Sequence, residues 1–88
     1  MTYHVVWDVE AYRKLEQIWT HAADIGPSVR AFDEIERLLA TAPEEQGESR
    51  ASGRRVLIVP PLGIIYRVQS RLQEVYVQEA WEFRRRQP

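Results

Sequence analysis

The sequence of 88 residues contains no cysteine, one lysine and two histidines. The absence of cysteine excludes a disulfide framework and thiolate chemistry, and it agrees with a reducing compartment. Two histidines without cysteine cannot complete a structural zinc site, so we expect no metal and no cofactor. The longest apolar run, at residues 56–62, contains two prolines and is much shorter than a membrane span. We therefore expect a cytoplasmic protein without a membrane-embedded segment.

The charge that the chain does contain is unevenly distributed. Residues 1–47 carry nine acidic and four basic side chains, whereas residues 48–88 carry four glutamates and eight arginines. The formal net charge of −1 therefore conceals a basic half in which every cation is arginine. Arginine is permanently charged and its planar donor group suits phosphate, so this half is a candidate polyanion-binding surface. The alternative is that these arginines are solubilising charges on strand edges.

The apolar pattern of the first half predicts one strand and two helices within a single domain, residues 1–88. Residues 3–7 are aromatic and β-branched, which is typical of a strand. Residues 9–23 and 27–40 each repeat apolar side chains on one helical face. Because only a short break separates the two segments, we expect an antiparallel helical hairpin.

The second half predicts a polar loop at residues 41–52 and then three strands at residues 54–59, 62–69 and 74–81. The order is therefore β-α-α-β-β-β, which is an α+β fold. A helical hairpin packed on one face of a small, mostly antiparallel sheet satisfies the two-layer rule. The other face of the sheet would then be open to a ligand or partner.

Short sequence patterns lie along these predicted elements. They are YHVVW at residues 3–7, Ala11 with residues 15–18, Leu38-Leu39 with Pro43 and Gly47, RASGR at residues 50–54, PLGIIYRV at residues 61–68, and VYV at residues 75–77 before a basic tail. Together they resemble the RelE/ParE superfamily of small bacterial toxins, over nearly the whole chain. The resemblance implies the toxin half of a type II toxin–antitoxin pair, of the plasmid-stabilisation type. Its expected partner is a cognate antitoxin that folds on the toxin.

The resemblance also implies a target, and three possibilities remain open. One branch of the superfamily cleaves messenger RNA on the ribosome, and this is the activity that we expect here. A non-enzymatic inhibitor of DNA gyrase is the alternative, and a degenerate member that only binds its antitoxin is the third. Two departures favour the alternatives: Gly63 stands where the ribonuclease branch usually has arginine, and no aromatic hydroxyl follows Trp81.

Metal-independent RNA cleavage by a 2′-hydroxyl requires a base, cations that stabilise the phosphorane, and an acid for the leaving oxygen. From the resemblance, the candidate catalytic residues are Glu48, Arg50, Arg55, Arg67 and Arg84. Glu48 is the candidate base because it is the only carboxylate among the arginines of its loop. The alternative for Glu48 is an ordinary solvated loop glutamate.

The arginines have assigned candidate roles with simpler alternatives. Arg50 and Arg55 are candidate phosphate contacts, and surface charge is the alternative for both. Arg67 is expected on the open sheet face because it alternates with apolar residues. Arg84 is a candidate contact to the phosphate or leaving group, with a frayed basic tail as the alternative. Trp81 is expected in the core or at the antitoxin interface, with base stacking as the alternative.

Overall fold

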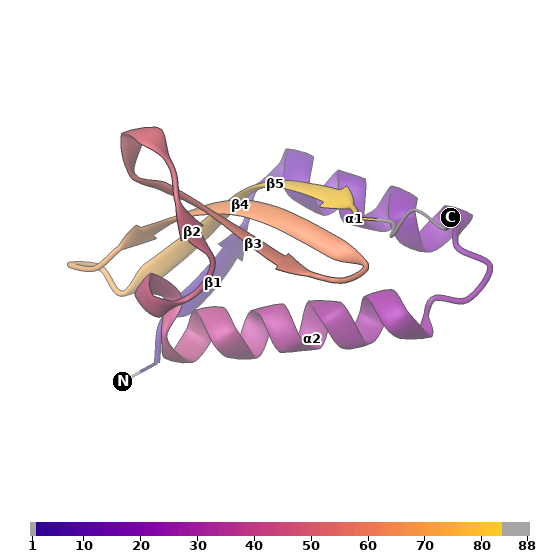
Figure 1. Cartoon of the computed structure of the whole chain (residues 1–88), viewed down its shortest axis with the longest axis horizontal. Coiled ribbons are helices and arrows are strands. Elements are labelled where there is room, and N and C mark those ends of the chain that lie inside the picture. Colours follow the sequence, from indigo (N-terminus) through magenta and orange to yellow (C-terminus); the bar gives the residue numbers. More distant parts are fainter. Residues whose placement is uncertain (1, 84–88) are drawn as a thin grey trace.

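The computed structural model describes residues 2–83, and Figure 1 shows how their elements are arranged. The elements in chain order are β1 (His4–Trp7), α1 (Val9–His21), α2 (Gly26–Thr41), η1 (Pro43–Glu45), β2 (Glu48–Ser49), η2 (Ala51–Gly53), β3 (Arg54–Val59), β4 (Leu62–Gln69) and β5 (Glu74–Glu82). The predicted α+β fold with a helical hairpin and a mostly antiparallel sheet is confirmed. No helix within residues 2–83 is long and apolar enough to cross a membrane.

One correction concerns residues 41–52, which the sequence predicts as an uninterrupted loop. Glu48 and Ser49 form the short strand β2, which pairs with β3, and two 3₁₀ turns flank it. Both residues of β2 are polar and exposed, so no apolar alternation marks the strand. It exists because β3 offers backbone partners, which is information that the segment itself does not contain.

The five strands form one sheet in the order β1-β5-β4-β3-β2. β1 runs parallel to β5, and all other neighbours are antiparallel. Both helices pack against the same sheet, α1 mainly over β5 and α2 over β1, β3 and β4. The buried apolar side chains of the two layers are Ala11, Leu15, Ile18, Ala31, Ile35, Leu39, Leu57, Leu62, Ile64, Tyr66, Val75 and Val77.

The helical hairpin is held to the first strand by an aromatic cluster. The ring of Phe32 in α2 lies 5.2 Å from that of Trp7 in β1 and 5.6 Å from that of Trp19 in α1, centroid to centroid. Such tilted and edge-on aromatic pairs add to the stabilisation from burial. Pro27 occupies the first turn of α2, where its missing N–H costs nothing.

The segment that leads into β2 is anchored from the covered side of the sheet. The hydroxyl of buried Tyr66 lies 2.7 Å from the carbonyl oxygen of Pro43 and 3.0 Å from that of Gln46. Arg55 Nε donates to the same Gln46 carbonyl at 2.9 Å. Burial raises the pKa of Tyr66, and nearby Arg55 opposes this only in part, so the hydroxyl stays a neutral donor. Positive φ at Gly47 completes the bend, where a Cβ would lie 2.1 Å from the Val56 carbonyl oxygen.

A β-bulge interrupts the pairing of β4 with β5. Tyr66 pairs with Val77, whereas the preceding Ile65 pairs with Glu79, so Gln78 is an extra residue on β5. Side chains on a regular strand alternate between faces, so one extra residue exchanges the faces of everything after it. The bulge therefore determines which face of the sheet receives the side chains at the end of β5.

Candidate functional site

The sheet face opposite the helices, called the open face below, carries a row of three polar side chains. The register pairs Arg54 of β3 with Arg67 of β4, and Arg67 with Tyr76 of β5. These residues alternate with the fully buried Tyr66 and Val77, so they point away from the helices. The placement of Arg67 agrees with the expectation from sequence alternation.

The two arginines of this row have different surroundings. Arg54 Nη2 donates to Glu79 Oε2 at 2.5 Å, while Arg54 Nε is buried and has no hydrogen-bond partner among the residues that the structure describes. Arg67 forms no hydrogen bond and no ion pair with any residue in the described range 2–83. Like charges directly opposite each other destabilise a sheet. The row therefore places two cations side by side with one carboxylate counter-ion, Glu79, which binds Arg54.

Glu48 and Arg50 form the rim of the open face at β2. Arg50 Nη2 lies 3.1 Å from Glu48 Oε2, and both side chains are more than half exposed. A hollow of about 330 Å³ lies beside them, lined by Arg50, Ala51, Arg54, Val56 and Ile65. The strand register places Glu48 in a second row on the same face, because Glu48 pairs with Val56, and Val56 pairs with Ile65. Glu48 and Arg50 therefore share the open face with Arg67.

Arg55 lies on the other side of the sheet. It pairs with Ser49 and Tyr66, and its guanidinium donates to the carbonyl oxygens of Gln46 and Gly47. The sheet thus separates Arg55 from Arg67, and the contacts of Arg55 hold the segment that carries β2. Arg84 lies outside the described residues.

Two open-face residues had no catalytic role assigned from the sequence. Arg54 is one of them, and only the strand register shows that it pairs with Arg67. Tyr76 is the other: its hydroxyl donates to Glu74 Oε1, and this hydrogen bond, with burial, raises the pKa of Tyr76. Tyr76 could have been found from the sequence, because strand alternation places it on the other face of the sheet from the apolar Val75 and Val77.

Trp81 explains the glycine at position 63. The register pairs Gly63 with Trp81, and a Cβ on Gly63 would lie only 2.4 Å from Trp81 Cε2. The indole ring therefore covers the place where the resemblance led us to look for an arginine. Trp81 is half-buried on the sheet, so its contact with an antitoxin or with an RNA base stays a prediction.

The described residues of the open face are balanced in charge. Arg50, Arg54 and Arg67 stand against Glu48, Glu74 and Glu79, so a polyanion must compete with carboxylates for the arginines. Exposed ion pairs contribute only about 0–1 kcal/mol, so this competition is feasible. The face offers the guanidinium of Arg67, which has no ion pair within residues 2–83, the guanidinium of Arg54, which is bound through one nitrogen, and the carboxylate of Glu48 at its rim. Residues 2–83 contain no cluster of three or more acidic or histidine side chains suited to a metal ion.

Comparison with known proteins gives matches at the level of structure. No protein-family model and no curated protein sequence matches the chain. A structure of the chromosomal ParDE toxin–antitoxin system from P. aeruginosa superposes with a TM-score of 0.69 at 22% identity, over 94% of this chain and 98% of that chain. The RelBE2 toxin–antitoxin complex from Mycobacterium tuberculosis also gives 0.69, at 17% identity, over 93% of this chain and 92% of that chain.

An archaeal RelE–RelB complex from Pyrococcus horikoshii gives a TM-score of 0.67 at 16% identity, over 98% of this chain and all of that chain. These matches span nearly the full length of both compared chains, so they concern the whole architecture and not a shared fragment. The resemblance that the sequence patterns suggested is confirmed for the architecture: the chain has the RelE/ParE fold.

Proposed function

We propose that the chain is the toxin component of a type II toxin–antitoxin pair and that it cleaves messenger RNA on the ribosome. The observation that carries this proposal is the pair Arg54–Arg67 on the open face, in which Arg67 has no partner within residues 2–83. Solved structures with this fold include toxin–antitoxin complexes, which supports the toxin assignment. Unneutralised arginine on a protein surface suits phosphate, which supports an RNA substrate.

The proposed reaction is transfer of the phosphoryl group within the RNA. Glu48 accepts the proton of a ribose 2′-hydroxyl, and the 2′-oxygen forms a bond to phosphorus. The bond from phosphorus to the 5′-oxygen breaks, which gives a 2′,3′-cyclic phosphate. The 5′-oxygen takes up the proton, and the products carry no net change in oxidation state. Arg67 and Arg54 stabilise the charge of the phosphorane.

The remaining candidates have supporting roles in this proposal. Arg50 holds the carboxylate of Glu48 through the contact at 3.1 Å. Arg55 acts from the covered side by fixing the segment before β2, so it positions Glu48 without touching RNA. Arg84 remains the proposed contact to the leaving group.

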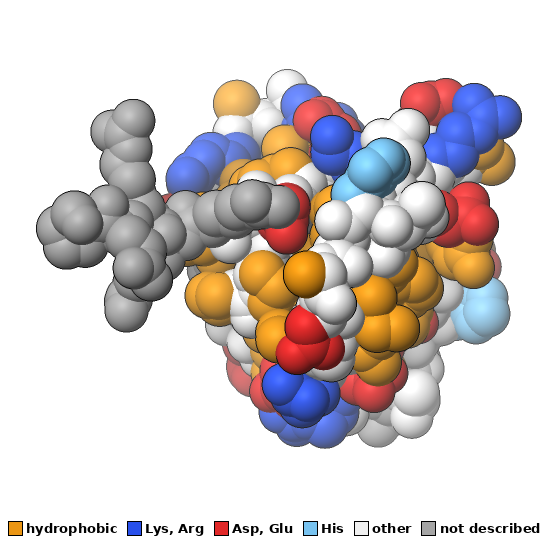
Figure 2. Space-filling model, turned by 90° about the vertical axis from the view of Figure 1, so that its right-hand side faces the viewer, with side chains coloured by type: hydrophobic (Ala, Val, Ile, Leu, Met, Phe, Trp, Pro, Cys, Tyr) orange, Lys and Arg blue, Asp and Glu red, His pale blue; other side chains and the backbone are white. Residues whose placement is uncertain are grey.

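A cognate antitoxin is the second proposed partner. Large apolar side chains are exposed at Val9, Tyr12, Ile25, Ile58, Leu72 and Phe83. Figure 2 views the end of the molecule near the α1–α2 connection, where hydrophobic side chains gather between charged ones. A segment that folds on binding can cover such scattered apolar surface. Co-expression tests this partner. If a neighbouring reading frame encodes the antitoxin, its product should relieve the growth arrest that this chain causes.

The decisive experiment is a reconstituted translation reaction with purified chain and a reporter messenger RNA, with new 5′ ends mapped by primer extension. We expect cuts that appear only while ribosomes elongate. Intact messenger RNA, with the chain shown to be folded by circular dichroism, would contradict the proposal. A parallel supercoiling assay then separates the alternatives: inhibited gyrase indicates the gyrase inhibitor, and unaffected gyrase indicates a chain that only binds its antitoxin.

A further inference from the structure

We infer that Arg54 and Arg67 form a binding site for a phosphodiester of single-stranded RNA, and that Glu79 is the exchangeable counter-ion of this site. In the absence of RNA the Glu79 carboxylate holds Arg54, and a phosphate displaces it. The inference deepens the proposed function, because it assigns a competitor to the proposed RNA surface. Glu79 lies in the last strand and carries no sequence signal for this role.

The bulge in β5 is what brings Glu79 to the open face. Val75 and Val77 point into the core and are fully buried, so regular alternation would turn residue 79 toward the core as well. The extra residue Gln78 reverses this, and Glu79 instead pairs with Ile65 on the open side. Bulges are frequent next to functional sites, where they redirect a side chain. The redirected carboxylate lies 2.5 Å from Arg54.

The hydrogen-bonding state of the two arginines suits an anionic ligand. Arg54 Nε is buried without a partner in the described part of the chain, even though Nη2 is bound to Glu79. Arg67, directly opposite, has no ion pair within residues 2–83. Buried polar groups without partners are rare and point to a ligand or water that satisfies them. A phosphodiester supplies several acceptor oxygens and could satisfy both guanidinium groups at once.

The Arg54–Glu79 pair is exposed enough to exchange. Its side chains are 36% and 57% exposed, respectively. An ion pair in contact with solvent is weakened by hydration and salt, so an incoming dianion or phosphodiester can replace the carboxylate. Exchange conserves charge at Arg54 and adds a new partner for Arg67.

The surroundings favour a single strand of RNA over a free phosphate ion. The hollow of about 330 Å³ beside Arg54 has apolar side chains, Val56 and Ile65, in its floor. Trp81 lies on the same face, two residues along β5 from Glu79. Sites for single strands combine arginine for the backbone with apolar or aromatic surface for the bases.

The experiment measures RNA binding without ribosomes, by fluorescence anisotropy of a 5′-labelled single-stranded RNA of ten nucleotides. Removing a competing carboxylate should tighten binding, so we expect Glu79→Gln to bind about five- to tenfold more tightly at low salt. Because one more arginine is then available to phosphate, the slope of log K against log salt should steepen by about 0.7. Arg67→Ala should instead weaken RNA binding by a similar factor.

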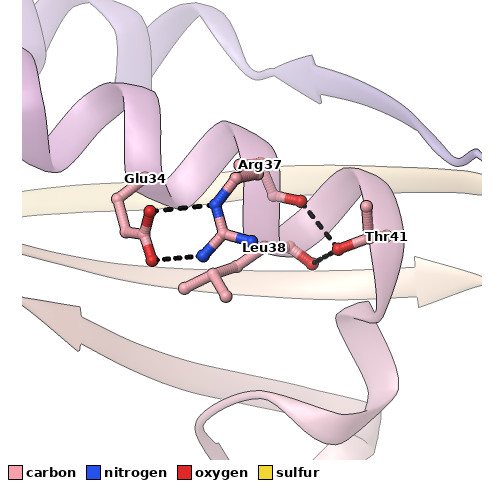
Figure 3. Close-up of polar contacts among 4 residues, drawn as sticks. All are labelled: Glu34, Arg37, Leu38 and Thr41. Atoms are coloured by element: carbon pink, nitrogen blue, oxygen red, sulfur yellow. Dashed lines mark hydrogen bonds and ion pairs between the residues drawn. The ribbon is translucent and has the colours of Figure 1, made fainter.

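Glu34→Gln is the matched control. Glu34 on α2 binds Arg37 through two hydrogen bonds, so this substitution removes the same charge and the same kind of ion pair at a place away from the open face (Figure 3). We expect this variant to change RNA affinity less than about twofold, through net charge alone. Equal tightening by Glu34→Gln and Glu79→Gln would overturn the inference, and so would unchanged or weaker binding by Glu79→Gln.

A measurement on the unsubstituted chain guards against a variant that fails to fold. In an NMR titration with inorganic phosphate, we expect the side-chain Nε–H signals of Arg54 and Arg67 to shift together. Unmoved signals at saturating phosphate would overturn the anion site. The failures are distinguishable: uncut messenger RNA with tighter Glu79→Gln binding removes the proposed cleavage alone, and cut messenger RNA with unchanged Glu79→Gln binding removes the counter-ion alone.

Discussion

The two faces of the sheet follow different physical rules, although the same strands build both. On the covered face, Ile64 and Tyr66 are fully buried, and the Tyr66 hydroxyl has carbonyl partners. On the open face, the following residue, Arg67, stands opposite another arginine and has no ion pair within the described chain. In the proposed function, stability and RNA binding depend on alternate residues of one strand, so we expect that each can be changed with little effect on the other.

The neighbours Arg54 and Arg55 make the same contrast at a single dipeptide. Arg55 is committed to the carbonyl oxygens of the segment before β2, on the covered side. In Arg54 only part of the guanidinium is bound: Nη2 donates to Glu79, and Nε has no partner within residues 2–83. An arginine whose donors are satisfied by the backbone is a structural residue, whereas an arginine with free donors is available to a ligand.

The largest expected difference between the faces is between Ile64→Ala and Ile65→Ala. Ile64 is fully buried among the helices, so its truncation should lower the free energy of unfolding by about 2–5 kcal/mol. Ile65 points to the open face and is only partly buried, so the same truncation should cost less, about 1–2 kcal/mol. Urea unfolding followed by circular dichroism measures both, and equal losses would show that the open face is also core.

The next effect concerns the hydroxyl that anchors the segment before β2. Tyr66→Phe leaves the carbonyl oxygens of Pro43 and Gln46 without this donor, so we expect a loss of about 1–3 kcal/mol. Amide hydrogen exchange should accelerate most at residues 43–49, because that segment loses its anchor. Uniform acceleration across the sheet would mean that the hydroxyl does not act locally.

Gly63→Ala tests the contact between Gly63 and Trp81 on the open face. The new methyl group would overlap the indole ring, so the ring must swing away at a cost of about 1–2 kcal/mol. Tryptophan fluorescence should shift to longer wavelength as Trp81 becomes more exposed to water. An unchanged spectrum and unchanged stability would contradict the close packing of this pair.

The smallest expected effect is the pH dependence of the Glu34–Arg37 pair on the outer surface of α2. The hydrogen bond from Arg37 lowers the pKa of Glu34 below its ordinary value of 4.5, with a smaller contribution from the charge of Arg37. A lowered carboxyl pKa stabilises the folded state above the ordinary value, and this stabilisation disappears as pH falls through the lowered value. Thermal unfolding of Glu34→Gln and of the unsubstituted chain should therefore converge on acidification below pH 4.5, and divergence would contradict the assignment.

The sequence was sufficient to predict the helices, the three long strands and the covered face, because each depends on apolar periodicity. The faces of β3 could not be assigned in this way. Its apolar residues lie on both sides, with Val56 and Ile58 on one and Leu57 and Val59 on the other. Alternation alone therefore could not decide whether Arg54 or Arg55 joins Arg67.

The role of Glu79 was also beyond the sequence. A bulge at Gln78 reverses the alternation of β5, and only the pairing with β4 reveals it. Strand β2 is similar, since two exposed polar residues become a strand only through their pairing with β3, the next strand of the chain. In each case the missing information is a pairing between strands, which local composition does not encode.

The most direct test of the central claim is the rate of messenger RNA cleavage by Arg67→Ala in the reconstituted translation reaction, beside Arg37→Ala as control. Arg67 has no ion pair to lose within residues 2–83, so its removal should leave stability unchanged within about 0.5 kcal/mol. If Arg67 stabilises the phosphorane, cleavage should slow by about 100-fold or more, while Arg37→Ala, on α2, should cut at the unsubstituted rate. Cleavage by Arg67→Ala at the rate of the control would contradict the account, because the open face would then not be where the chemistry takes place.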